Sequence, residues 1–188
     1  MNRREALKRV AALVGGTLSI PTVAAALSGC QPSGSGSLMT FTADQAELVA
    51  TIAERIIPAT DTPGARAAGV HRFIDLILAE TALPEDRERF LAGLDAVDAQ
   101  CEEDYGQPFL ACTPEEQNDL LTQWDEAAFG NGASSSPDTP PFFQMMKELT
   151  LVGYYTSEIG ATQELRFDPV MGRYDPCVPF DEIGRAWA

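Results

Sequence analysis

Prolines divide this chain into segments of helical length. Pro58, Pro84, Pro114 and the pair Pro140–Pro141 each border a stretch of regularly spaced apolar residues. Proline disfavours the helical conformation of the residue before it and is well tolerated in the first turn of a helix, so each position marks a helix boundary. Between the boundaries, apolar residues recur at the three-to-four spacing of one buried helix face. We therefore predict a mainly α fold, an irregular single-domain bundle of about five helices.

Capping signals refine the limits of these helices. Thr42 and Gln45 can bond each other's backbone amides in a capping box, and Thr113 and Glu116 repeat the pattern. The predicted helices cover residues 43–57, 70–82, 85–103 and 114–129, followed by a fifth that begins at Pro140–Pro141.

The apolar stripes of these helices define a predicted core. It consists of Leu48, Ile52 and Ile56; Val70, Phe73, Ile74, Ile77 and Leu78; Phe90, Leu91, Leu94 and Val97; Leu120, Leu121, Trp124 and Phe129; and Phe142, Met145, Met146, Leu149, Val152, Gly153 and Tyr154. Between the first two helices, the pair Pro63–Gly64 predicts a type II turn, which needs a positive φ at the glycine.

The C-terminal stretch, residues 161–188, has a different composition. Pro169, Gly172, Pro176 and Pro179 are spread among aromatic and aliphatic residues. Prolines at this density are incompatible with a long helix, and the apolar content is too high for a free linker. We expect an extended arm that lies on its own domain or on a partner.

The N-terminal stretch has the order of an export signal. A basic head containing Arg3 and Arg4 precedes an apolar run that is interrupted by Pro21 and is too short for a stable membrane span. The adjacent arginines resemble the bacterial twin-arginine signal, whose translocase carries folded proteins. We expect residues 1–29 to be a signal peptide and the protein to reach the periplasmic side of a bacterial membrane.

Cys30 follows the small residues Ser28 and Gly29 and the apolar Leu27, which is the pattern of a lipobox. Acyl chains on Cys30 would hold the chain on a membrane surface. The alternative is an ordinary signal with an incidental cysteine. We expect a flexible linker over residues 30–40 and a helical domain over residues 41–188.

The charge of the chain argues against nucleic acid as a partner. The formal net charge is −15, and four of the 13 basic residues lie in the signal segment, so the mature chain is more acidic still. Phosphate binding requires clustered lysine and arginine.

Three cysteines remain besides Cys30. Cys101 and Cys112 are close in sequence, and an oxidising compartment favours a disulfide between them. Cys177 is then unpaired, which indicates either a free thiol or a bond to another chain. A metal site is less favoured because no C-x-x-C spacing occurs and His71 is the one histidine.

Several common catalytic patterns are missing from the sequence. It contains no C-x-x-C-H haem site, no G-x-G-x-x-G, no P-loop and no G-x-S-x-G. His71 is read as a surface or cap-satisfied residue, since no nucleophile is tied to it by a motif. We identify no catalytic, cofactor-binding or metal-binding residue.

Two blocks of sequence resemble the gluconate 2-dehydrogenase subunit 3 family: residues 54–75, from Glu54-Arg55-Ile56-Ile57-Pro58 onwards, and residues 143–157 with the arm that follows. The matching positions are Pro58, Asp61, Thr62, Pro63, Gly64, Gly69, Phe73, Asp75, Gly153 and Tyr154.

The resemblance implies a non-catalytic small subunit of a membrane-bound, flavin-dependent dehydrogenase. In such complexes a large subunit carries FAD, and a multiheme cytochrome c subunit carries heme c. The small subunit helps to mature, co-export and stabilise the flavin subunit, and Cys177 is a candidate for a disulfide to it. The alternative is an independent periplasmic lipoprotein, either an enzyme or a ligand-binding domain, with a site near Asp61, His71 and Asp75.

Overall fold

The computed structural model describes residues 37–130, 141–168, 172 and 177–187. Leu38–Ala188 is a unit separate from Met1–Ser37, and it contains every helix described below. The predicted signal residues Arg3 and Arg4 and the lipidation residue Cys30 lie outside the described residues. Within the described ranges, no helix has both the length and the apolar character needed to cross a membrane.

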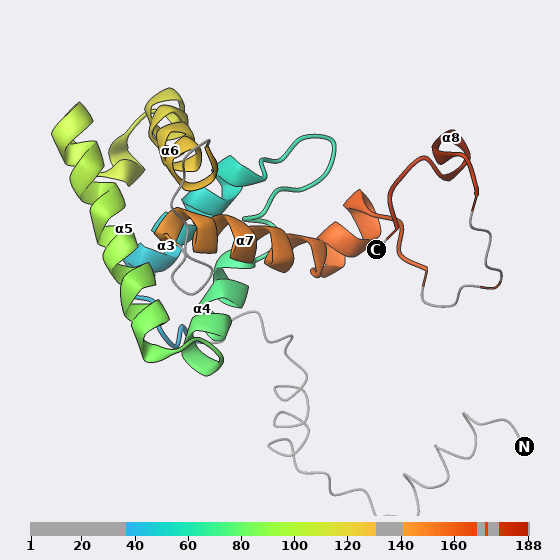
Figure 1. Cartoon of the computed structure of the whole chain (residues 1–188), viewed down its shortest axis with the longest axis horizontal. Helices are drawn as coiled ribbons and strands as arrows, with labels where there is room; N and C mark the ends of the chain where they lie inside the picture. Colours follow the sequence, from blue (N-terminus) through green and yellow to red (C-terminus); the bar gives the residue numbers. More distant parts are fainter. Residues whose placement is uncertain (1–36, 131–140, 169–171, 173–176, 188) are drawn as a thin grey trace, which may run out of the picture. The chain divides into compact units, whose positions relative to one another are not determined.

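Five helices form the body of the second unit, which confirms the predicted mainly α fold (Figure 1). They are α3 (Ala43–Ile56), α4 (Val70–Glu80), α5 (Pro84–Tyr105), α6 (Pro114–Phe129) and α7 (Phe142–Tyr155). Three short elements complete the described chain: η1 (Phe109–Ala111), the π-helix η2 (Gly160–Glu164) and α8 (Phe180–Ile183).

Local sequence signals set the helix starts. Both capping boxes are present: Thr42 and Gln45 cap α3, and Thr113 and Glu116 cap α6. Each box satisfies backbone donors that the first turn of a helix leaves without a partner. Pro84 and Pro114 occupy the first position of α5 and α6, as the missing amide of proline allows.

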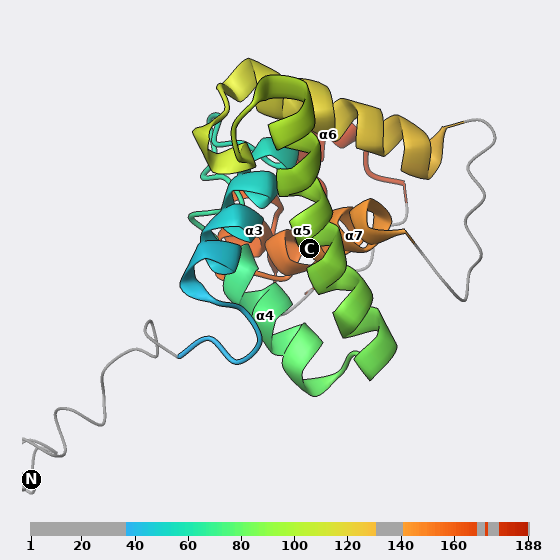
Figure 2. The same cartoon turned by 90° about the vertical axis from the view of Figure 1, so that its left-hand side faces the viewer.

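Helix α7 lies at the centre of the body and packs against α3, α4, α5 and α6. Figure 2 shows α5 crossing in front of α3 and α7, with α6 above and α4 below. The buried face of α7 is made by Phe142, Phe143, Met146, Thr150, Gly153 and Tyr154.

An aromatic cluster joins α5, α6 and α7. The Phe142 ring lies edge-on to Phe90 at a centroid distance of 5.1 Å and edge-on to Trp124 at 5.8 Å. Gly93 allows this approach, because a Cβ there would collide with the Phe142 ring. Edge-to-face pairs of this kind add to the free energy gained by burying the rings.

Two residues expected in the core are exposed. Phe129 is 48% exposed at the end of α6, where Lys147 lies over its ring, and Val152 is 51% exposed on α7. Both belong to helix stripes with the correct period, but the neighbouring elements leave about half of each side chain exposed. Periodicity identifies the apolar face of a helix and does not establish that a neighbour reaches its full length.

The arm contains more helix than its prolines suggested. Residues 160–164 form the single π-helical turn η2, and residues 180–183 form α8. An isolated parallel bridge pairs Arg166 with Trp187 and closes the arm into a loop. Prolines exclude a long helix but allow a single turn that begins immediately after them, as α8 does after Pro179.

Candidate functional site

The first sequence block folds into the loop between α3 and α4. The Ala65 amide donates to the Ile57 carbonyl at 3.0 Å, and the Val70 amide donates to the Ala65 carbonyl at 3.2 Å. Gly69 precedes α4 with φ of 72°, in the left-handed region that glycine adopts without a steric penalty. These contacts fix both ends of the loop, and we call residues 57–69 the motif loop.

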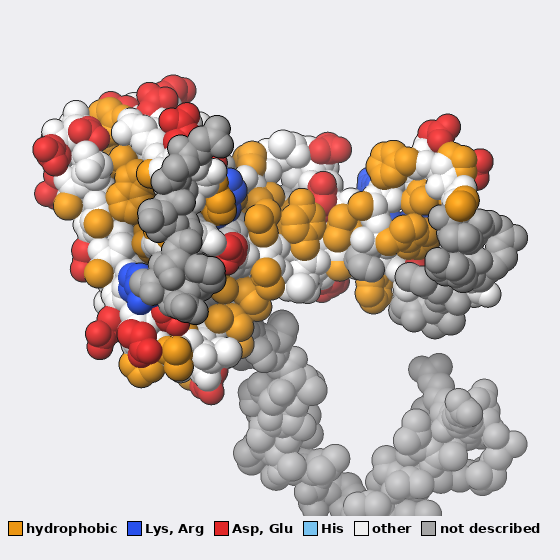
Figure 3. All heavy atoms as spheres, viewed as in Figure 1, with side chains coloured by type: hydrophobic (Ala, Val, Ile, Leu, Met, Phe, Trp, Pro, Cys, Tyr) orange, Lys and Arg blue, Asp and Glu red, His pale blue; other side chains and the backbone are white. Residues whose placement is uncertain are grey.

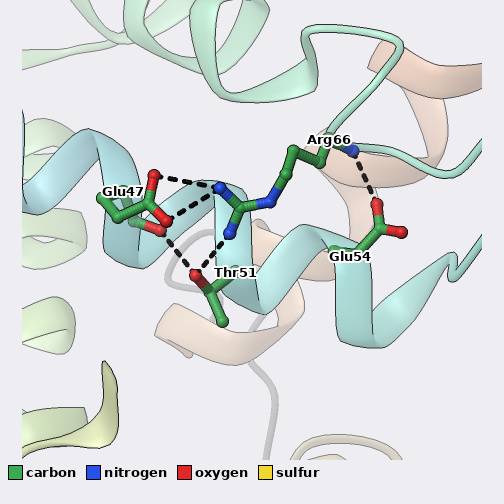
Figure 4. Close-up of polar contacts among 4 residues, drawn as sticks. All are labelled: Glu47, Thr51, Glu54 and Arg66. Atoms are coloured by element: carbon green, nitrogen blue, oxygen red, sulfur yellow. Dashed lines mark hydrogen bonds and ion pairs between the residues drawn. The ribbon is translucent and has the colours of Figure 1, made fainter. Parts of the chain in front are cut away.

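A single carboxylate holds the motif loop closed. Glu54 Oε1 accepts from the Ala59 amide at 3.0 Å. Glu54 Oε2 accepts from the Arg66 amide at 2.9 Å, as Figure 4 shows. A Cβ on Gly64 would lie 2.5 Å from both carboxylate oxygens. Gly64 does not have a positive φ, so the predicted type II turn is wrong. Glycine is needed here because of the adjacent carboxylate.

Arg66 extends this network to the first turns of α3. Its Nη1 lies 2.8 and 2.9 Å from the Glu47 carboxylate oxygens, and its Nη2 donates to Thr51 Oγ1 at 2.7 Å (Figure 4). The Arg66 and Glu47 side chains are both largely exposed, so solvent screens the ion pair and its contribution to stability is small. Its effect is to orient the motif loop on α3.

Asp75 binds the segment that leads into α3. Its carboxylate accepts from the backbone amides of Met39 at 2.7 Å, Thr40 at 2.9 Å and Phe41 at 2.8 Å. Asp75 is only 4% exposed. A buried carboxylate is tolerated where several amides donate to it. The chain at residues 39–41 is therefore fixed to α4, and this part of the expected 30–40 linker is held on the domain.

The second sequence block meets the first. Tyr154 Oη donates to the Pro63 carbonyl at 2.8 Å, so α7 holds the tip of the motif loop. Gly153 lies against Phe73 of α4, and a Cβ at this glycine would be 2.6 Å from the Phe73 ring. The family positions that are far apart in sequence thus form one packed cluster.

The remaining motif positions lie towards solvent. Thr62 Oγ1 donates to Glu164 Oε2 at 2.7 Å, which joins the motif loop to η2. Pro58 and Asp61 are exposed, and Asp61 accepts from the Thr60 hydroxyl at 3.0 Å. The structure therefore brings together most of the predicted family positions and leaves Pro58 and Asp61 at the edge.

His71 is half-buried on α4, one turn before Asp75. Its Nδ1 has no hydrogen-bond partner among the described residues. Desolvation by burial lowers the pKa of His71, and the nearby Arg72 and Arg66 charges lower the pKa further. The imidazole is therefore favoured in its neutral form. Asp75 is already bound to three amides, so these two side chains do not form an acid–base pair.

Two cavities lie away from this cluster. One, of about 400 Å³, lies between α3, α6 and α7 and is lined by polar residues that include Arg55, Asp125 and Lys147. The other, of about 410 Å³, lies in the arm. Neither is lined by Asp61, His71 or Asp75. Among the residues that the structure describes, no three His, Cys, Asp or Glu side chains are grouped as a metal site would require.

The three cysteines that the structure describes are free thiols. Cys101 near the end of α5 and Cys112 after η1 are both buried, and Cys177 on the arm is exposed. Burial raises the pKa of Cys101 to about 12, and a hydrogen bond with Cys112 contributes to that shift. The two thiols thus lie next to each other. A disulfide between them stays a prediction, as does the partner of Cys177.

The contacts of Glu54 and Asp75 could not be foreseen in detail, although Glu54 carries one signal. An acidic residue in the last turn of a helix is disfavoured by the helix dipole, so its presence near the end of α3 indicates another role. Asp75 has no comparable signal, since the backbone amides that donate to its carboxylate lie more than thirty residues earlier in the chain.

Comparison with known proteins identifies the family. Residues 43–172 match the family described as gluconate 2-dehydrogenase subunit 3, and the chain belongs to that family. The family's name marks it as a subunit of a multi-subunit gluconate dehydrogenase. No curated protein and no solved structure matches the chain.

Proposed function

We propose that this chain is the non-catalytic small subunit of a membrane-bound, flavin-dependent gluconate 2-dehydrogenase-like complex. It assists the maturation, twin-arginine co-export and stability of the flavin subunit. FAD belongs to that subunit, and heme c belongs to a multiheme cytochrome c subunit.

One observation carries the non-catalytic role. Most of the family positions form a packed cluster whose polar groups hold the fold: Tyr154 donates to the Pro63 carbonyl, and Asp75 accepts from three backbone amides. A catalytic group must reach a substrate atom within hydrogen-bond distance. Side chains that are hydrogen-bonded to the backbone stabilise the conformation of the domain. A stable conformation is what a partner subunit needs for recognition.

The export signal supports the partner role. Arg3 and Arg4 resemble the twin-arginine signal, whose translocase carries folded cargo. A folded flavin subunit bound to this chain in the cytoplasm would cross the membrane with it. The signal then serves two chains.

A lipid on Cys30 would keep the complex at the membrane. Only residues 31–38 separate Cys30 from the segment that Asp75 fixes, and a chain of that length spans at most about 28 Å when fully extended. The domain would remain close to the bilayer surface, on the periplasmic side.

Deletion of this chain from the organism tests the proposal. The flavin subunit is then followed by immunoblotting in cytoplasmic, periplasmic and membrane fractions. We expect it to stay in the cytoplasm and to lose membrane-associated dehydrogenase activity. Wild-type chain should restore export, and a chain carrying Arg3→Lys with Arg4→Lys should not.

Normal export and activity without this chain would overturn the proposal. The independent-lipoprotein alternative predicts a different outcome: the purified chain alone would oxidise a sugar acid or bind it. His71, whose Nδ1 lacks a described partner, would be the first residue to substitute in that case.

The exposed Cys177 has a proposed partner within the same complex. We expect it to form a disulfide with the flavin subunit, because an unpaired cysteine in an oxidising compartment favours an intermolecular bond. A non-reducing gel of the membrane extract should show one band that contains both chains. Cys177→Ser should remove that band, and its absence from wild-type extract would contradict the bond.

A further inference from the structure

Helix α7 has two apolar faces in its C-terminal half, and only one of them is buried. On the buried face, Gly153 lies against Phe73 of α4, and the Tyr154 side chain reaches the motif loop. Leu151, Val152 and Tyr155 occupy the other side and are exposed. Leu151 and Val152 lie four and three residues before Tyr155, so each is a neighbour of Tyr155 on the helix surface.

The arm continues the exposed apolar character. Phe167, Phe180 and Trp187 are all exposed, and Phe180 is 67% exposed. Contacts nevertheless join residue 166 at the start of the arm to residues 186 and 187 near its end. The Arg166 amide donates to the Ala186 carbonyl at 2.8 Å, and the Arg166 guanidinium lies 4.4 Å from the centre of the Trp187 ring. Ordered aromatic side chains in water cost free energy unless a partner covers them.

Figure 3 shows apolar side chains along α7 and again over the arm. Residues 149–157 contain no charged residue, although the whole chain has 28 acidic residues among 188. Depletion of charge with enrichment of aromatic residues is the composition of an interface centre. We define the α7–arm surface as Leu151, Val152, Tyr155, Phe167, Phe180 and Trp187.

We infer that the α7–arm surface is the docking site for the flavin subunit, an inference that rests on the function proposed above. The arm cavity of about 410 Å³ adds a chemical requirement. Its lining includes no carboxylate and two arginines: Arg166, whose guanidinium lies over the Trp187 ring, and Arg185, which donates to the Gln163 carbonyl. The partner's face therefore presents an apolar centre and places an acidic side chain opposite these arginines.

Charge distinguishes this partner from two other occupants. A second copy would bring a net charge of −15 or below against a chain of the same sign, which opposes association. Anionic lipid headgroups would meet the same repulsion. A partner protein can match both parts of the surface. Its apolar residues would cover the α7–arm surface, and its acidic residues would lie only opposite the arm cavity.

The test measures binding of the purified flavin subunit to the full mature chain by biolayer interferometry. Val152→Asp and Phe180→Asp should each weaken binding by at least about 30-fold, the loss expected of interface hot spots. The matched control is Leu83→Asp. Leu83 is 59% exposed, lies between α4 and α5 outside the surface, and takes an N-cap position that aspartate suits. The Leu83→Asp variant should bind the flavin subunit with the same affinity as the wild-type chain.

Each outcome decides between the two proposals. Wild-type affinity in both surface variants would overturn the docking site and leave the proposed function intact, whereas no binding by the wild-type chain would overturn the proposed function itself. Thermal unfolding of each variant is compared with wild type; Val152→Ser replaces Val152→Asp, and Phe180→Ser replaces Phe180→Asp, if the aspartate variant does not fold. A wild-type dimer in light scattering that Val152→Asp dissociates would assign the surface to a second copy and overturn the inference.

Discussion

The helical body and the C-terminal arm use similar side chains in opposite ways. In the body, the Phe142 ring packs edge to face against Phe90 and Trp124; Phe90 and Phe142 are buried, and Trp124 is partly buried. In the arm, Phe167, Phe180 and Trp187 are exposed. The body is stable through its own buried contacts, whereas the arm exposes the kind of surface that another chain can cover. This contrast separates residues that make the fold from residues available for binding.

The largest expected effect tests the contrast directly. Phe142→Ala removes a buried ring from the aromatic cluster and should lower the free energy of unfolding by about 3–5 kcal/mol. Phe180→Ala in the arm should change it by less than about 0.5 kcal/mol, since an exposed side chain loses few contacts. Urea unfolding of both variants measures the difference. Equal losses would show that the arm belongs to the same cooperative unit as the body.

A second prediction concerns the body's two buried thiols. Oxidation of Cys101 and Cys112 to a disulfide closes a short loop and should raise the free energy of unfolding by about 3 kcal/mol. Mass spectrometry of the protein isolated from its own organism without reductant would identify the bond, and unfolding with and without reductant would measure its contribution. Cys177→Ser serves as the control, because the arm thiol should not affect either measurement. Two alkylatable thiols at 101 and 112 in exported protein would refute the bond.

A third prediction tests the attachment of the N-terminal segment to the body. Asp75→Asn removes the negative charge that three amides share and should lower the free energy of unfolding by about 2 kcal/mol. Asp61→Asn is the matched control on the exposed side of the motif loop and should have almost no effect. Hydrogen exchange of the Met39, Thr40 and Phe41 amides gives a second readout. Unchanged protection in Asp75→Asn would contradict the assigned contact.

The smallest effect sharpens the role of α7. Tyr154→Phe removes one hydrogen bond to the Pro63 carbonyl and should lower the free energy of unfolding by about 1 kcal/mol. Tyr155→Phe, on the exposed side of the same helix, should leave stability unchanged. If the docking surface is correctly assigned, substitution of Tyr155 by alanine should instead weaken binding to the flavin subunit. Loss of stability in both phenylalanine variants would mean that the two faces of α7 are not distinct.

Much of the fold followed from local signals in the sequence. Helix starts at Thr42 and Thr113 were predictable because a capping box involves residues only three positions apart. The family resemblance likewise depended on contiguous blocks, and the match over residues 43–172 confirms it.

Non-local requirements escaped prediction. Gly64 is required by the Glu54 carboxylate that approaches it across the loop, and Asp75 is required by amides at residues 39–41. Val152 has the correct spacing for a core position, yet the C-terminal half of α7 extends beyond α5 and α6 (Figure 1). Sequence spacing describes one element at a time, whereas these three outcomes depend on which other element lies opposite.

The attachment of residues 39–41 to Asp75 also has a mechanical consequence. Tension applied through the preceding chain would meet the bond between the Met39 amide and Asp75 first, then those of Thr40 and Phe41, before it reached the first turn of α3. The load would pass into α4, a helix packed in the body, and the capping box of α3 would be shielded from it.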